Sequence, residues 1–520
     1  MRLLLPVFIV LGCALTARVG MAASLEAGLA ITDPLALRTL DRNERQPTEG
    51  LDFGVGHIFA PAQADHAPMT NDALFALPSM APVRRALEAG FDRYIARRRS
   101  EGTGESIGIG PPFAVQLFAR DVLFSSRSRF VLSGIVNRMD RAYVAPATCG
   151  EIRLIYRLTR IGGKGTPDTS PRLPMTLNVI VKAKDERQSD VTCADIARRW
   201  LATATWPQTG ADLAIRLMSP EGPLALLKPS NVVQIETNLQ IAHMPKSATQ
   251  DFRTDYLLKM FNYDRATQTF REAPLENQID RERLLGDRAL ATAFRRWLLV
   301  PDHLAAFDRG TLILPSEFLA TAAVAPTPVG FAPSDLQPAF GLVGSDDDKA
   351  AVFRTSDVVT ALNEAAANGA VLQNIRSVAG FARRLNDITC AGCHQTRGIG
   401  GFHFPGVDWM AAKPDNSVVV PASPHFYGDQ ARRRDILAAF RDGRSPDFSR
   451  GFSDRPQLRG DTRLLGTEYN DGWGAHCYDS GGGGGDRSFR SWTCATGLAC
   501  QVTGAATTTS HMGMCFVGTR

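Results

Sequence analysis

The chain has 520 residues, a formal net charge of +5 at pH 7, 44% hydrophobic residues and 21% charged residues. This composition is that of folded domains and excludes an intrinsically disordered chain. The small net charge, with lysines and arginines scattered along the chain, argues against nucleic-acid binding, which needs basic residues gathered on one face. The length predicts about three domains.

Residues 1–23 have the pattern of a secretory signal peptide. Arg2 supplies a positive start, Leu3 to Leu15 form an almost unbroken apolar run, and small residues follow up to a cleavage position near Ala22. The run is shorter than the about 20 residues that cross a bilayer. We therefore predict a periplasmic, secreted or cell-surface protein with no transmembrane segment after cleavage. The alternatives are an uncleaved anchoring helix and lipid attachment at Cys13.

The nine cysteines fit an oxidising compartment, because eight remain once Cys13 leaves with the signal peptide. Cys149 and Cys193 are predicted to form a disulfide, since no other cysteine lies near them in the sequence. A second close pair lies at residues 390 and 393. The last four cysteines allow three pairings, among which the sequence does not choose: Cys477, Cys494, Cys500 and Cys515.

Residues 24–340 are predicted to form an exported α+β part that is rich in strands. They contain no nucleophile elbow, zinc-binding helix or phosphate loop, so their role is not predicted. Helices are expected at 83–98, 194–201 and 288–299. Strands are expected at 130–136, 152–158, 175–181, 232–241 and 256–263, with a turn at 264–267 leading into a further strand from residue 269.

Residues 341–470 are predicted to be mainly helical. One helix is expected to begin at Ser356 as its N-cap and to stop at Asn368-Gly369. A second helix places apolar side chains of the range 375–385 on one face and leads directly into Cys390. Cys390 is therefore expected to lie at the end of this second helix.

The segment Cys390-Ala391-Gly392-Cys393-His394 has the spacing required for covalent haem attachment. Two thiols separated by two residues reach the two vinyl groups on one edge of a porphyrin, and the imidazole that follows is held under the iron. The alternatives are a redox disulfide, half of a zinc site or a structural bridge. A redox pair of the thioredoxin kind belongs to a βαβ unit, which is not expected here.

This segment resembles the c-type cytochromes, and the resemblance covers only residues 345–430. It implies a cytochrome c-like haem-binding domain within 341–470, one covalent haem c attached by a maturation system, and His394 as the proximal iron ligand. The rest of the chain is not cytochrome-like. The motif occurs once, which argues against the di-haem peroxidases.

Electron-transfer cytochromes place a methionine or a second histidine opposite the proximal histidine. His403, Met410 and His425 are the candidates for this sixth ligand, and an open iron is the alternative. Arg397 is a candidate partner for a haem propionate, because a guanidinium binds carboxylates at two points. Arg432-Arg433-Arg434 could do the same, although a solvated helix face is the preferred interpretation.

Residues 471–520 differ from the rest of the chain. Gly481 to Gly485 form a run of five glycines, and the four last cysteines lie around it with few apolar residues. Such a segment holds its shape through disulfides. We expect a stapled terminal cap, with a partner-docking module as the alternative.

The function predicted from these features is extracytoplasmic electron transfer with a redox partner protein. A haem enzyme of the peroxidase or oxygenase type, with an open iron, is the first alternative; no acid–base pair beside the haem can be identified to support it. The second alternative is a binding or sensor protein with structural haem, in which the strand-rich half and the tail recognise a ligand.

Overall fold

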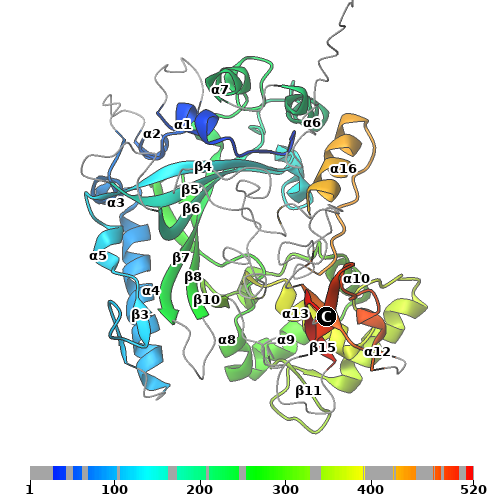
Figure 1. Ribbon diagram of the computed structural model, residues 1–520. Helices are drawn as coiled ribbons and strands as arrows, with labels where there is room; N and C mark the ends of the chain where they lie inside the picture. The colour runs from blue at the N-terminus through cyan, green and yellow to red at the C-terminus, as the bar shows by residue number, and fades with distance from the viewer. Residues whose placement is uncertain are drawn as a thin grey trace, which may run out of the picture.

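The structure is a computed structural model of the chain. It describes residues 27–42, 51–60, 68–101, 106–161, 172–206, 210–244, 253–327, 341–390, 392, 426, 429–452, 472, 475–481, 485–502 and 511–518. The predicted signal peptide lies outside these residues. What is described is a mixed α/β protein with one large sheet in its N-terminal half (Figure 1).

The large sheet is antiparallel except for one short parallel pair, β2 with β3. Its strand order is β1-β4-β5-β6-β7, and β7 then pairs with both β3 and β8, while β8 also pairs with β9 and β10. Every strand predicted from the sequence is present, and the predicted turn joins β8 to β9. The strands are β1 (Ala30–Ile31), β2 (Ile107–Gly108), β3 (Val115–Leu117), β4 (Ser128–Arg138), β5 (Glu151–Arg160), β6 (Arg172–Lys182), β7 (Val232–Met244), β8 (Arg253–Asp264), β9 (Thr269–Ala273) and β10 (Ala322–Thr327).

One face of this sheet forms the main hydrophobic core. Leu154, Leu177, Ile235 and Leu257, one from each of four neighbouring strands, are all buried there, as expected from the two-residue period of a strand. Helices from the first half of the chain cover this face on the outer side of the twisted sheet (Figure 1). These helices are α1 (Pro34–Arg42), α2 (Val55–Phe59), α3 (Asn71–Ala76), α4 (Ala81–Ser100), α5 (Arg120–Leu123), α6 (Cys193–Ala202) and α7 (Gly210–Met218).

The predicted disulfide Cys149–Cys193 is present, with Cα atoms 5.4 Å apart. Cys193 is the first residue of α6, whose N-terminus is closed by a capping box between Thr192 and Asp195. Cys149 has a φ of 58° in the turn before β5. The bridge therefore fastens the start of α6 to the edge of the sheet.

A second hydrophobic core lies on the other side of the sheet (Figure 1). A chain of ring contacts runs through it, in the order Phe318, Phe294, Phe353, Phe381 and Phe307. The elements that build this core are α8 (Arg281–Gly286), α9 (Arg288–Leu298), α10 (Pro301–Arg309), α12 (Thr355–Ala367) and α13 (Val378–Asp387), with the short parallel pair β11 (Val343–Gly344) and β12 (Phe353–Arg354).

The limits of α12 differ in part from the prediction. The helix begins at Thr355, so Ser356 lies inside its first turn and is not the N-cap. The backbone N–H of Ser356 is bonded instead to the Asp346 carboxylate at 2.9 Å, which satisfies a donor that the first turn of a helix leaves open. The predicted stop is confirmed, because Asn368 is the C-cap and Gly369 has a φ of 85°.

The C-terminal tail contains the disulfides Cys477–Cys500 and Cys494–Cys515. They staple a small sheet of β13 (His476–Tyr478), β14 (Leu498–Gln501) and β15 (Met512–Val517) in the order β13-β15-β14. The sequence predicted too few apolar residues for a core here, but the tail does have a small one. Phe452, from before the tail, joins it and supplies part of the missing apolar surface. Its buried residues are Phe452, Phe489, Trp492, Met512 and Met514.

The tail packs on the N-terminal end of α13. The Ser377 hydroxyl caps α13 through the N–H of Gly380 and also donates to the Asp486 carboxylate at 2.7 Å. Further along the helix, Arg383 donates to His476 at 2.7 Å and lies over the Trp492 ring. The tail is thus fastened to the helix that precedes Cys390.

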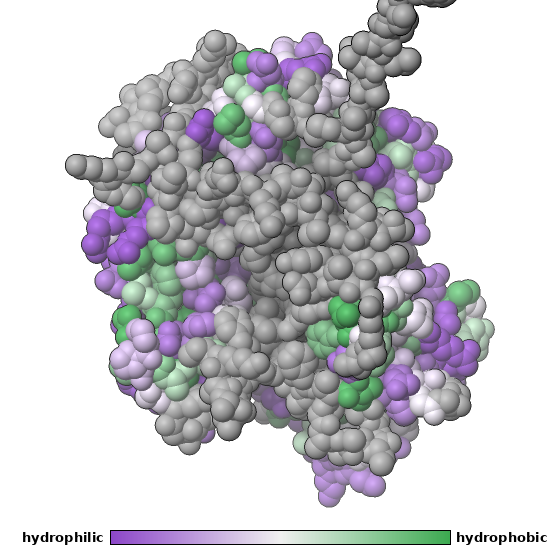
Figure 2. Space-filling model, in the orientation of Figure 1, coloured by the Kyte–Doolittle hydropathy of each residue, from purple (hydrophilic) through white to green (hydrophobic). Residues whose placement is uncertain are grey.

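Among the described residues, no helix is both long and apolar enough to span a membrane. On the face drawn in Figure 2, hydrophobic side chains occur in separate small groups among hydrophilic ones wherever the surface is coloured.

Candidate functional site

Cys390 is the one residue of the predicted haem site whose surroundings can be described. It follows α13 by three residues, and the intervening Thr389 hydroxyl donates to the carbonyl of Asn386 at 2.6 Å. The same hydroxyl accepts the N–H of Gly392 at 2.9 Å, which turns the chain at this point. The other site residues named from the sequence lie outside the described residues: Cys393, His394, Arg397, His403, Met410 and His425.

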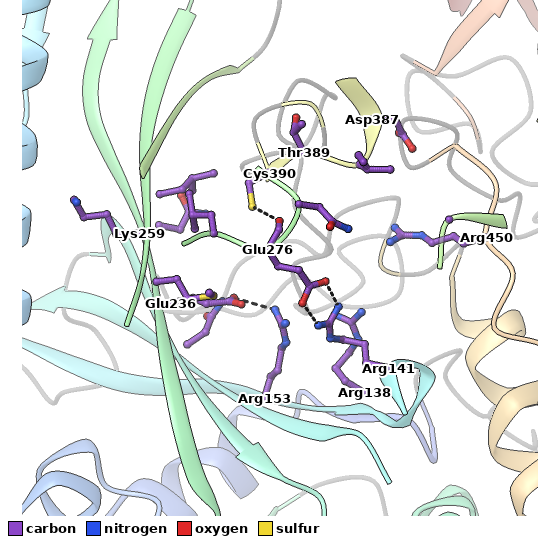
Figure 3. Close-up of a pocket in the computed structure, with 18 of the residues that line it drawn as sticks. Arg138, Arg141, Arg153, Glu236, Lys259, Glu276, Asp387, Thr389, Cys390 and Arg450 are labelled. Atoms are coloured by element: carbon purple, nitrogen blue, oxygen red, sulfur yellow. Dashed lines mark hydrogen bonds and ion pairs between the residues drawn. The ribbon is translucent and has the colours of Figure 1, made fainter. Parts of the chain in front are cut away.

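The Cys390 side chain lies against an apolar surface on the sheet. It packs on a cluster formed by Leu258, Leu275 and two alanines of β10, to which Met260 also belongs. Its sulfur lies 3.7 Å from the backbone carbonyl oxygen of Glu276 (Figure 3). The end of α13 is therefore held against β8 and the loop that follows β9.

A cavity of about 200 Å³ lies between the sheet and the end of α13. Figure 3 shows Cys390 on one side and Arg138, Arg141 and Arg153 on the other, with Glu276 between them and its carboxylate joined to Arg141. Lys259 points away from its centre in the same view, toward the core face of β8. The volume is below the about 300–1,000 Å³ of typical sites for drug-sized ligands and cofactors, so the cavity itself suits a smaller molecule.

The floor of the cavity is the second face of the large sheet, and it is polar. Arg153 on β5, Asn178 on β6, and Glu236 and Asn238 on β7 all line it. Asn178 pairs with Glu236 across the ladder, and Glu236 pairs in turn with Met260. Arg153 and Asn178 are 8% and 3% exposed, respectively, so this polar surface is buried inside the protein.

Ion pairs tie the floor of the cavity to the loop beside Cys390. Arg153 bonds Glu151 at 2.7 Å and Glu236 at 2.9 Å. Arg141 forms an ion pair with Glu151 at 2.9 Å and donates hydrogen bonds to both carboxylate oxygens of Glu276. Two arginines and three glutamates thus form one connected network.

Glu151 and Glu276 are held in their charged form. Burial opposes the ionisation of Glu151, but Arg141 and Arg153 outweigh it and lower its pKa to about 2. The pKa of Glu276 is lowered in the same way, with burial opposed by Arg141. The pKa of Arg141 is raised well above its usual value, because Glu151 and Glu276 outweigh its burial. At neutral pH Glu151, Glu276 and Arg141 are therefore charged, and each of the two acids lies beside a guanidinium.

A buried arginine fixes the last turn of α13. Arg384 donates to Asp387 at 3.0 Å, to the carbonyl of Asp308 at 2.6 Å and to the carbonyls of Arg450 and Gly451. Its side chain is 1% exposed, and burial lowers its pKa despite the nearby carboxylates. These bonds hold the helix that precedes Cys390 to α10 and to the segment near residue 450.

The preferred interpretation of Arg432-Arg433-Arg434 as a solvated helix face is wrong for its first two members. They lie on α16 (Gln430–Arg441), which packs against α6. Arg433 is 2% exposed and bonds Asp429 at 2.8 Å, while Arg432 bridges Asp429 and Asp140. Burial lowers the pKa of Arg433 to about 10. These guanidiniums are engaged by carboxylates of the protein, because α16 turns them inward toward the end of β4.

The sequence analysis did not single out the residues that line this cavity. A signal for them exists in β5, where Glu151, Arg153 and Arg157 occupy alternate positions among apolar residues. In a strand with one face in the core, charged residues at every second position mark the other face. Glu276 reaches this face because of the path that the chain takes after β9. No local pattern in the sequence predicts that path.

Comparison with known protein families found no matching family model, and comparisons with curated proteins and with solved structures found no match either.

Proposed function

We propose that this protein is an exported mono-haem c-type cytochrome-like protein that acts in extracytoplasmic electron transfer. The single observation that carries the proposal is the segment Cys390-Ala391-Gly392-Cys393-His394, whose first thiol lies just beyond α13 against an apolar surface. Cys390 and Cys393 would hold the haem covalently, and His394 would be the proximal ligand. The three disulfides support an oxidising compartment.

The surroundings of Cys390 fit one edge of a porphyrin. Leu275, Ala323 and Ala325 would offer the apolar surface that a macrocycle and its vinyl groups need next to an attachment thiol. The cavity of about 200 Å³ is smaller than typical cofactor sites, so we do not propose it as the haem pocket. When bound, the haem supplies a one-electron redox couple.

The protein's own residues would position the attachment thiol and exclude water from it. Arg384 and the C-terminal tail hold α13 from two sides, so the thiol of Cys390 is presented from a rigid helix. The apolar wall keeps water away from that side, and such a shell is one of the means by which a protein sets a redox potential. Arg397 stays the predicted partner of a haem propionate.

The choice between electron transfer and haem catalysis depends on the sixth iron ligand. His403, His425 or Met410 in that position would give a six-coordinate iron suited to passing electrons to a redox partner protein. An open position would instead favour the alternative of a peroxidase- or oxygenase-type enzyme. A spectrum separates the two outcomes.

The test is the visible absorption spectrum of the exported protein, produced together with a cytochrome c maturation system. The oxidised, reduced and carbon monoxide-treated reduced forms are compared. A sharp reduced α-band that carbon monoxide leaves unchanged supports electron transfer, whereas a high-spin spectrum shifted by carbon monoxide supports the enzyme. Absence of haem absorbance would overturn the proposal and leave Cys390 and Cys393 as a structural pair.

Matched variants test the attachment itself. Cys390→Ala and Cys393→Ala should each reduce the haem that stays with the protein on a denaturing gel, because each removes one of the two thioether bonds. Replacement of both Cys149 and Cys193 by alanine is the control for loss of cysteines, with haem measured per molecule of exported protein, because this pair forms its own disulfide at the main hydrophobic core. Haem retention that is equal in all variants would contradict attachment at residues 390 and 393.

A further inference from the structure

The polar floor of the cavity contains hydrogen-bonding groups that the described protein does not use. Asn178 is 3% exposed, and its Oδ1 has no hydrogen-bond partner among the described residues. The Oδ1 of Asn238, on the neighbouring strand, is also buried without a partner within that part of the chain. A buried acceptor left unbonded costs about 1–3 kcal/mol, so native proteins seldom leave one without a ligand or an ordered water.

These two carboxamides lie close together on one face of the sheet. Asn178 is opposite Glu236 in the ladder, and Asn238 lies two residues further along β7 on the same face. Diagonal neighbours of this kind are about 7–8 Å apart. One small molecule can therefore bond both amides at the same time.

The charged side chains nearest the carboxamides are already engaged in ion pairs. Arg153 is paired with Glu151 and Glu236, and Arg141 is paired with Glu151 and Glu276. An ion that entered the cavity would have to compete with these pairs and would lose its own hydration. The groups left for a ligand are the neutral amides, each of which has both an acceptor oxygen and donor N–H atoms.

Beside the amides the floor becomes apolar. Leu258 is the ladder partner of Asn238, and Met260 is the ladder partner of Glu236, so the apolar and polar halves of the floor are contiguous. Both residues line the cavity. A ligand that suits this floor has hydroxyl groups along one edge and C–H groups along the other, with a size matched to about 200 Å³.

We infer that the cavity is a binding site for a small neutral polyhydroxyl compound the size of one sugar ring. Asn178 and Asn238 bond its hydroxyl groups, and Leu258 and Met260 pack against its C–H face. The site does not depend on haem attachment, because all four residues belong to the sheet.

The experiment is a calorimetric titration of the full exported protein with matched probes. D-glucose, D-galactose, D-ribose and D-mannitol are the neutral probes, while D-glucuronate and D-glucosamine are charged probes of similar size. Saturable binding of at least one neutral probe, at least tenfold tighter than both charged probes, is the expected result. No saturable binding of any neutral probe would mean that the cavity holds water only, and equal or tighter binding of a charged probe would contradict a neutral ligand; either overturns the inference.

Variants connect the binding to the floor of the cavity. Asn178→Leu and Asn238→Leu should each weaken binding of the neutral probe at least tenfold. The melting temperature of Asn178→Leu should stay unchanged or rise, since an unbonded buried amide is replaced by an apolar group of similar shape. Asn262→Leu is the control, because Asn262 lies on β8 outside the cavity and bonds Gln234. Equal loss of binding in Asn178→Leu and Asn262→Leu would overturn the inference.

The haem spectrum separates this result from the proposed function. A protein that lacks haem absorbance but binds the neutral probe supports the cavity site and contradicts the cytochrome proposal. A protein that carries haem but binds no neutral probe supports the cytochrome proposal and contradicts the cavity site.

Discussion

The guanidinium of Arg141 donates hydrogen bonds to both carboxylate oxygens of Glu276, while the backbone carbonyl oxygen of Glu276 lies 3.7 Å from the Cys390 sulfur. Arg141 comes from the turn after β4, and Glu276 comes from the loop after β9. One residue thus connects the ion-pair network of the sheet to the proposed haem-attachment thiol. The position of that thiol depends on tertiary contacts from residues more than 100 positions earlier in the sequence.

Removing the carboxylate of Glu276 should destabilise the protein. In Glu276→Gln, Arg141 loses a charged two-point partner but keeps Glu151, so we expect a loss of about 1–3 kcal/mol in the free energy of unfolding. Urea denaturation measures it. Glu282→Gln is the control, because that carboxylate is 81% exposed and its ion pair with Arg97 is long, at 3.7 Å. Equal losses in the two variants would show that the ion pair between Arg141 and Glu276 contributes no more to stability than an exposed carboxylate does.

Stability should fall in acid because of Glu151. Burial disfavours its ionisation, but Arg141 and Arg153 lower its pKa in the folded state from 4.5 to about 2. Because its pKa is lower in the folded state than in the unfolded state, ionised Glu151 stabilises the fold at pH values above about 4.5. This stabilisation is lost as the pH falls from about 4.5 toward 2. The shift corresponds to a contribution on the order of 3 kcal/mol.

The pH dependence of unfolding tests this assignment. Urea denaturation between pH 5 and pH 2.5 should show a smaller decrease in stability for Glu151→Gln than for the wild type, since the variant has no proton to take up at this position. Glu88→Gln, which removes an exposed helix carboxylate paired with Arg84, should keep the wild-type slope. A wild-type slope in Glu151→Gln would contradict the lowered pKa.

Loss of the Cys149–Cys193 disulfide should destabilise the N-terminal half. The bridge closes a loop with a sequence separation of 44, for which the chain-entropy relation gives about 4 kcal/mol. The variant with both cysteines replaced by alanine should therefore unfold at lower urea concentration. A loss below about 1 kcal/mol would show that the bridge adds little to the contacts between α6 and the sheet.

Asp308 should be required for the docking of α13. Its carboxylate accepts the backbone N–H groups of Gln373, Asn374 and Ile375, at 2.7 to 2.9 Å. Asp308→Ala leaves these donors without that acceptor, and we expect a loss of about 3 kcal/mol or more, with faster amide hydrogen exchange at 373–375. Asp308→Asn keeps one acceptor oxygen and should lose less.

Asp302→Ala is the matched control for Asp308, because Asp302 is an exposed residue in the first turn of the same helix. It should change stability by no more than about 1 kcal/mol through the helix dipole. Unchanged exchange at 373–375 in Asp308→Ala would contradict the proposed anchoring.

The sequence by itself determined the local elements. The long strands β4 to β8 and the helices α4, α6, α9, α12 and α13 follow from hydrophobic periods of two and 3.6 residues, which depend only on neighbours along the chain. The Cys149–Cys193 pair could be predicted because no other cysteine lies between or near them. The spacing of Cys390, Cys393 and His394 likewise predicts haem attachment from local geometry alone.

Only the tertiary structure decided what surrounds these elements. The pairing of the four tail cysteines depends on the register of β13 and β14 on β15, which no local pattern specifies. Arg433 is buried because α16 packs against α6, although its sequence neighbours indicate a solvated face. The cavity floor brings together side chains from the four strands β5 to β8, and Cys390 meets it from just beyond a helix far along the chain. Contacts of this kind arise from how elements pack, and packing is a property of the whole fold.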